Sequence, residues 1–308
     1  MGFILVILLS FGIIIFALPK KNLAGSYLSE YSHKEALLDS VSSPRVIFIS
    51  GSSIAFGLNS GMIKDSLDVN VINYGLNAGI GLKFMIEDVE EYLKEGDIVV
   101  LVPEFGQFYG KFNGSDELLA LMEITDWRKI DKVNYSQLRK ILKSMGQYSF
   151  SKLSKSFATG KAEKPVGIRK DFDRFPYWDY RVEGFNEFGD EESHWYYELH
   201  TNVPSPTSLG GEIDYAAIDF LKNKIREWSN DYKVVFIPSA TTDSYFQLNK
   251  DRILSLSEEF TKSGIPYDGN VTDAVFPDSM AFDLPSHFNA TGVNLNTQRI
   301  INILKEKL

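Results

Sequence analysis

Short apolar runs alternate with helix-period segments along much of the chain. Runs rich in β-branched residues occupy positions 45–50, 69–73, 98–102 and 233–237, and each has the length and composition of a strand buried on both faces. Between the second and third runs, apolar residues recur at the spacing of an amphipathic helix, at Leu82, Met85, Ile86, Val89 and Leu93. Strands that alternate with helices predict an α/β fold with a mostly parallel sheet covered by helices.

The alternation weakens between residues 111 and 211, which we interpret as an insertion in the main domain. Short helices are predicted inside it, around 116–124 and 135–142. The regular pattern returns after the insertion and ends in a helix predicted from about 293 to 305.

Aromatic residues crowd into the second half of this insertion. Ten of them fall within residues 172–197: Phe172, Phe175, Tyr177, Trp178, Tyr180, Phe185, Phe188, Trp195, Tyr196 and Tyr197. Such rings either stack on sugars, with Trp178 and Trp195 as candidate substrate contacts, or seal an irregular insertion against the main domain.

An almost unbroken apolar run covers residues 2–18 and is closed by a proline and two lysines. Its length is near the roughly 20 residues that span a bilayer, and it is also within the range of a signal-peptide core. A signal peptide would carry basic residues before the run, and this chain has none there. We therefore expect a membrane anchor or uncleaved signal at 1–19, a polar connector at 20–43 and a main domain at 44–308.

Charge and composition narrow the classes of function. The net charge of −9 disfavours a general nucleic-acid binder, because neutralising phosphates requires an excess of Lys and Arg. The absence of cysteine excludes thiol catalysis, disulfides and cysteine-ligated zinc. The carboxylates do not combine with histidines at ligand spacing, so neither a metal site nor a cofactor is predicted.

A turn rich in serine follows the first predicted strand at once, as Ser50-Gly51-Ser52-Ser53. A serine at the carboxyl end of a parallel strand faces the crevice where α/β proteins bind ligands, which makes Ser53 the candidate nucleophile. Ser52 takes that place if the turn is shifted by one residue, and helix capping is the structural alternative. The turn does not match the Gly-x-Ser-x-Gly elbow, since Ala55 stands at the second glycine position.

A nucleophilic hydroxyl needs a base, and the chain has only four histidines. His33 lies in the connector, while His194 and His200 lie in the aromatic insertion, where packing or surface roles explain them. His287 directly precedes the last helix, with Asp283 four residues before it. This spacing can place the carboxylate beside one imidazole nitrogen while the other nitrogen faces the serine.

Together these segments resemble the SGNH (GDSL-like) superfamily of serine esterases and acyltransferases, of whose four sequence blocks three are similar to segments here. The first block has its nucleophile third in a Gly-x-Ser turn, which corresponds to Ser53 after Gly51. The last block has an Asp and a His before a C-terminal helix, which corresponds to Asp283 and His287. The resemblance implies a three-layer α/β/α, flavodoxin-like fold with a Ser-His-Asp triad.

The second block of the family, Asn-x-Gly-x-x-Gly, is similar to the segment that runs from Asn73 to Gly79. In the family its last glycine donates a backbone N–H to the oxyanion. Here Ala78 stands at that position and Gly79 follows it, so the resemblance implies oxyanion donors at the N–H groups of Ser53 and Gly79, with Ala78 as the alternative. Asn77, in the same segment, is a candidate substrate contact.

The third block, usually Gly-x-Asn-Asp, is where the chain departs from the family. The segment after the third predicted strand contains Glu104 and Gln107 in place of the Asn. Gln107 is the substitute amide donor to the oxyanion, and Glu104 is expected to shape the substrate pocket. A similar departure occurs in membrane-anchored relatives that are linked to acylation of exported polysaccharides and teichoic acids.

The resemblance implies acyl transfer on ester groups, with acetyl expected, of a cell-envelope or exported glycan, by an esterase or an O-acyltransferase. It also implies a single-pass location in a bacterial membrane with an extracytoplasmic main domain, and a membrane-bound acyltransferase as a possible partner. Lys20 and Lys21 favour the opposite orientation by the positive-inside rule. The main alternative is a catalytically inactive SGNH-like protein that binds a glycan or acts as a scaffold. A lipase for soluble substrates has no sign of a lid to support it.

Overall fold

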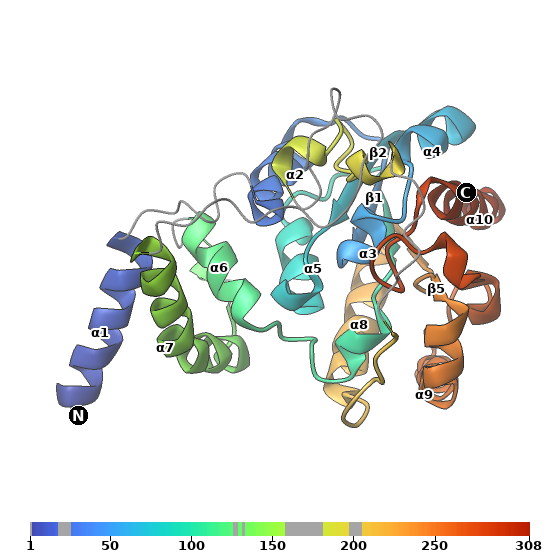
Figure 1. Cartoon of the computed structure of the whole chain (residues 1–308). Helices are drawn as coiled ribbons and strands as arrows, with labels where there is room; N and C mark the ends of the chain where they lie inside the picture. The colour runs from blue at the N-terminus through green and yellow to red at the C-terminus, as the bar shows by residue number, and fades with distance from the viewer. Residues whose placement is uncertain (1, 18–25, 126–128, 131–132, 158–180, 197–204) are drawn as a thin grey trace.

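A four-stranded parallel sheet forms the centre of the chain in a computed structural model (Figure 1), which describes residues 2–17, 26–125, 129–130, 133–157, 181–196 and 205–308. The strand order is β2-β1-β3-β4, and all three pairings are parallel. The strands are β1 (Arg45–Ser50), β2 (Asn70–Gly75), β3 (Ile98–Leu101) and β4 (Lys233–Phe236). The prediction of an α/β fold with a parallel sheet is confirmed.

Helices pack on both faces of this sheet because side chains alternate along β1. Ile47 and Ile49 point into the larger apolar cluster, whereas Val46 and Phe48 point into the smaller one. The larger cluster takes side chains from α2 (Glu30–Ser40), α5 (Leu82–Glu90), α8 (Tyr215–Trp228) and α9 (Asp243–Lys262). The smaller takes side chains from α3 (Ser52–Ala55), α4 (Ser60–Leu67) and α10 (Ala290–Lys307).

The segment predicted as a polar connector contains α2, which is part of the core. Tyr31, Lys34 and Leu38 are buried on one side of this helix. One of the three is a lysine, so the apolar periodicity that marks a core helix is incomplete in the sequence. A further small sheet joins β5 (Thr241–Thr242) to β6 (Val275–Phe276).

Three helices gather at the end of the molecule away from the sheet (Figure 1): α1 (Gly2–Ala17), α6 (Asp116–Ile124) and α7 (Tyr135–Phe157). The helix predicted at 135–142 is therefore much longer than expected. Within the described ranges, no helix combines the length and the apolar character needed to cross a bilayer. The membrane anchor at 1–19 stays a prediction.

Lys34 is a fully buried cation at the carboxyl end of β2. Its Nζ donates a hydrogen bond to the Gly75 carbonyl oxygen (2.7 Å) and lies 4.9 Å from the centre of the Phe185 ring. Burial lowers the pKa of Lys34 to about 8, against the opposing effects of Glu30 and Asp190. The positive charge of Lys34, which lies in the segment predicted as a connector, is thus buried inside the fold.

We expect the contribution of Lys34 to the free energy of unfolding to grow as pH rises from 8 toward 10.5. In that window the unfolded chain keeps the lysine proton and the folded chain loses it, so stability increases with pH. Urea unfolding of wild type and Lys34→Met should give free energies whose difference changes by about 2 kcal/mol between pH 7.5 and 9.5. The control is Lys250→Met, which removes an exposed lysine. If the difference in free energy of unfolding from wild type did not change with pH for either variant, the buried-cation account would be contradicted.

Candidate active site

The turn after β1 presents one of its two neighbouring serines to a histidine. Gly51 is the N-cap of α3, so Ser52 and Ser53 occupy the first turn of that helix. The Ser52 side chain is partly exposed, and its Oγ lies 2.9 Å from Nε2 of His287. Ser52 is therefore the serine that can exchange a proton with His287.

His287 is oriented by contacts on its other side. Its Nδ1 lies 2.8 Å from Oδ1 of Asp283, as the sequence spacing predicted. The turn between them is closed by the His287 N–H, which donates to the Leu284 carbonyl (3.1 Å). The Phe56 ring stacks on the imidazole with centroids 4.3 Å apart and planes 9° from parallel. A carboxylate and a ring thus fix the plane in which His287 meets Ser52.

The prediction that Ser53 faces His287 is wrong. Its hydroxyl is buried and lies 3.1 Å from Oγ of Ser50 and 3.4 Å from Oγ of Ser239. Successive side chains on a helix point about 100° apart, so the two serines of one turn cannot both meet the same imidazole. The shifted turn left open in the sequence is the observed arrangement.

The carboxylate of Glu104 lies against the same turn. Glu104 follows β3, the strand next to β1, and its Oε1 accepts a hydrogen bond from the Ser53 N–H (3.0 Å). A Cβ on Gly51 would stand 2.3 Å from that oxygen, so the absence of a side chain there makes room for the carboxylate. The backbone N–H predicted as an oxyanion donor therefore has an acceptor from the protein itself.

The second predicted donor, the Gly79 N–H, also has an internal partner. Asn77 is the N-cap of the short helix at 78–80, and its Oδ1 accepts from the Gly79 N–H (2.8 Å). Ala78 lies closer to the serine turn, since its Cβ is 2.9 Å from the position of a Cβ on Gly51. Asn77 thus supports the backbone, and Ala78 is the nearer of the two alternatives in this segment.

The side-chain amide of Gln107 uses its oxygen, but not its nitrogen, in a hydrogen bond within the described protein. Its Oε1 accepts from the backbone N–H of Glu104 (3.0 Å), which fixes the orientation of the amide. Its Nε2 is buried and has no hydrogen-bond partner among the residues that the structure describes. An unpaired buried amide costs free energy, and Gln107 lines the cavity beside the serine turn.

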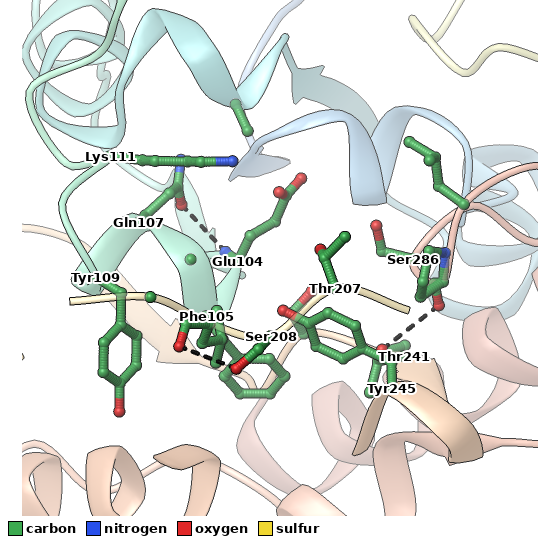
Figure 2. A pocket seen from close by; sticks show the side chains of 18 residues that line it. Glu104, Phe105, Gln107, Tyr109, Lys111, Thr207, Ser208, Thr241, Tyr245 and Ser286 are labelled. Carbon is green, nitrogen blue, oxygen red and sulfur yellow. Dashed lines mark hydrogen bonds between the residues drawn. The ribbon is translucent and has the colours of Figure 1, made fainter. Parts of the chain in front are cut away.

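This cavity has a volume of about 310 Å³ (Figure 2). None of the three triad residues is among the residues that line it. Ser286, which precedes His287, lines it, as does Ser239. Hydroxyl groups and charges of both signs surround the space, including Glu104, Lys111 and Tyr245. Burial, and then the charge of Glu104, raises the pKa of Tyr245 to about 12, so its hydroxyl stays protonated at neutral pH. The lining suits a polar ligand with several hydroxyl groups.

The aromatic insertion contributes support behind the site. His194 is fully buried, with Nε2 2.8 Å from the Phe288 carbonyl oxygen and Nδ1 hydrogen-bonded to Glu191. Its ring is 5.2 Å from that of Phe56, so it backs the ring that stacks on the triad histidine. The packing role expected for His194 is confirmed. No pattern in the sequence marked Phe56 as a residue that stacks on His287.

Of the two candidate sugar-stacking tryptophans, Trp195 does not line the described cavity. Trp195 packs against the cluster that contains Phe288 and Val293, and its indole nitrogen is buried. Trp178 and His200 lie outside the described residues.

No protein-family model, characterised protein or solved structure matches this chain at a significant level.

Proposed function

We propose that the chain is an SGNH-type serine esterase or O-acyltransferase in which Ser52 is the nucleophile. The hydrogen-bonded series from Ser52 through His287 to Asp283 carries this proposal. His287 takes the hydroxyl proton as Ser52 Oγ attacks the ester carbonyl, and it returns that proton to the departing alcohol. Asp283 holds the imidazole tautomer. Water then attacks the acyl-enzyme in an esterase, whereas a sugar hydroxyl attacks it in a transferase. Either attack transfers the acyl group and frees Ser52.

Glu104 imposes a condition on this chemistry. A tetrahedral oxygen formed at Ser52 carries negative charge and needs N–H donors nearby. The Ser53 N–H is one such donor, and the Glu104 carboxylate now holds it (3.0 Å). Turnover through this donor therefore requires the Glu104 side chain to rotate away as the substrate enters the cavity.

The cavity and the N-terminal segment support a glycan substrate at a membrane. A volume of about 310 Å³ fits a sugar unit with a short acyl group such as acetyl, and the hydroxyl-rich lining matches such a ligand. An apolar N-terminal segment would hold the domain near envelope or lipid-linked glycans at high effective concentration. An extracytoplasmic location and a membrane-bound acyltransferase partner belong to the same proposal.

One observation favours a second candidate, a glycan-binding protein without catalysis. A carboxylate against the Ser53 N–H disfavours a developing oxyanion unless it moves. In this reading the cavity beside the serine turn binds the sugar through its own polar lining, such as Tyr245 and Ser286.

Labelling with a fluorophosphonate separates the two candidates. We expect the folded wild-type chain to acquire one adduct, assigned to Ser52 by peptide mass spectrometry. His287→Ala should remove the adduct, because the serine loses its base. Unlabelled wild-type protein would then be assayed for turnover of acetylated glycans, and for transfer when an acceptor sugar is added, because the adduct blocks Ser52. A folded wild type without any adduct, together with measurable glycan binding, would favour the binding protein.

A further inference from the structure

Helix α7 concentrates positive charge in a chain that is acidic overall. Its 23 residues include five basic and no acidic residues, whereas the whole chain has a net charge of −9. The basic residues are Arg139, Lys140, Lys143, Lys152 and Lys155. Lys152 is buried and paired with Glu123 (2.6 Å), while Arg139 and Lys143 are exposed and pair with no carboxylate in the described ranges. Free positive charge therefore remains on the surface of this helix.

The same helix exposes large apolar side chains. Tyr135 is 82% exposed and Phe150 is 75% exposed, and Leu138 and Leu142 also face solvent. At 3.6 residues per turn, Tyr135, Leu138 and Leu142 share one side of the helix, with the exposed basic residues on its flank. An apolar stripe bordered by lysine and arginine is typical of a helix that lies in a membrane interface.

Helix α1 packs beside α7 and exposes apolar side chains of its own. It runs beside α7 in the same direction (Figure 1), since Ser149 Oγ donates to the Phe11 carbonyl oxygen (3.4 Å) and Lys152 donates to that of Ile15. On its other side α1 exposes three apolar residues at helical spacing: Val6, Leu9 and Ile13, each 58–65% exposed. Ile15 itself is fully buried. The last turns of α1 are thus covered by α7.

We infer that α1 and α7 dock together on an anionic lipid bilayer. Their exposed apolar side chains enter the interface, and Arg139 and Lys143 lie beside the lipid headgroups. The occupant is lipid and not a nucleic acid because the charge is interleaved with exposed Leu, Phe and Tyr. It is anionic because α7 carries five basic and no acidic residues, although the chain is acidic overall. This inference is independent of the proposed chemistry at Ser52.

Single cysteines test the depth of each helix, since the natural chain has none. Phe150→Cys on α7, Ile13→Cys on α1 and Leu295→Cys on α10 would be made in the full chain and labelled with a nitrobenzoxadiazole dye. With vesicles that contain phosphatidylglycerol, we expect a blue shift and protection from iodide at positions 150 and 13. The dye at 295, an exposed position (45%) on the main domain, should remain unchanged.

Charge variants test the headgroup contact. Arg139→Gln with Lys143→Gln should weaken binding to phosphatidylglycerol vesicles by roughly 30-fold, at about fivefold for each basic residue. Lys250→Gln with Lys305→Gln removes the same charge from exposed positions elsewhere and should change binding less than twofold. A blue shift at 13 without one at 150, equal binding to phosphatidylcholine vesicles, or protection of 150 by self-association without lipid would each overturn the inference. All of these results are readable whether or not Ser52 reacts.

Discussion

Replacing Ser52 by alanine is expected to lower ester turnover by roughly 10⁴-fold or more, whereas Ser53→Ala should lower it by less than about tenfold. Of the two serines in this turn, Ser52 is the one within hydrogen-bond distance of His287 (2.9 Å), so its hydroxyl is the one that this base can deprotonate. The Ser53 hydroxyl is buried against Ser50 and Ser239, and alanine at this position would retain the backbone N–H. Initial rates on an acetyl ester, compared at equal folded concentration, measure the difference.

The paired variants control for folding, since both lose one hydroxyl from the same helical turn. The double variant Ser52→Ala with His287→Ala should be no slower than the more impaired single variant, because residues that act as one unit do not give additive losses. A tenfold or smaller loss in Ser52→Ala, or a larger loss in Ser53→Ala, would remove Ser52 from the role of nucleophile.

Replacing Asp97 by alanine is expected to lower the free energy of unfolding by about 3–5 kcal/mol. Asp97 accepts from Nε of Arg45 (3.1 Å), and both side chains are completely buried. The other guanidinium nitrogens donate to the carbonyls of Leu38 and Tyr92, so Arg45 ties α2 and the turn before β3 to the start of β1. Without Asp97, that guanidinium is a buried charge with no counterion.

Urea denaturation at pH 7 provides the measurement. The control is Asp231→Ala, which removes an exposed carboxylate and should change stability by less than about 0.5 kcal/mol. Asp97→Asn keeps the shape of the side chain but not its charge, and it should still lose most of the stability. Equal losses for Asp97→Ala and Asp231→Ala would show that the pair contributes nothing beyond a surface contact.

The strands and the Asp283–His287 pair were predictable because each has a local signature. Apolar runs of strand length identify β1 and β3, and a carboxylate four residues before a histidine is visible without a structure. The choice between Ser52 and Ser53 was not predictable. It depends on the residue at which α3 begins, and a helix of one turn has no periodicity from which to read that.

The oxyanion donors show a different limit. A sequence shows which N–H groups and side-chain amides could donate a hydrogen bond to an oxyanion. It does not show whether another part of the fold already supplies an acceptor for them. The carboxylate of Glu104 reaches the Ser53 N–H from the end of another strand, 51 positions away. The helix at 30–40 was missed for a related reason, since the groups that accompany the buried Lys34, Gly75 and Phe185, are distant from it in the sequence.

The Glu104 carboxylate competes with any bound ligand for the Ser53 N–H, because it accepts a hydrogen bond from that group. A tethered carboxylate acts at an effective concentration on the order of millimolar or above, without any diffusion step. A free carboxylate released at Ser52 would meet a position that another carboxylate already holds (3.0 Å). A ligand that is to accept from the Ser53 N–H must first displace the Glu104 carboxylate, and a negatively charged ligand is repelled by it. Under the proposed chemistry, an uncharged ester would meet no repulsion from Glu104, whereas the carboxylate product would.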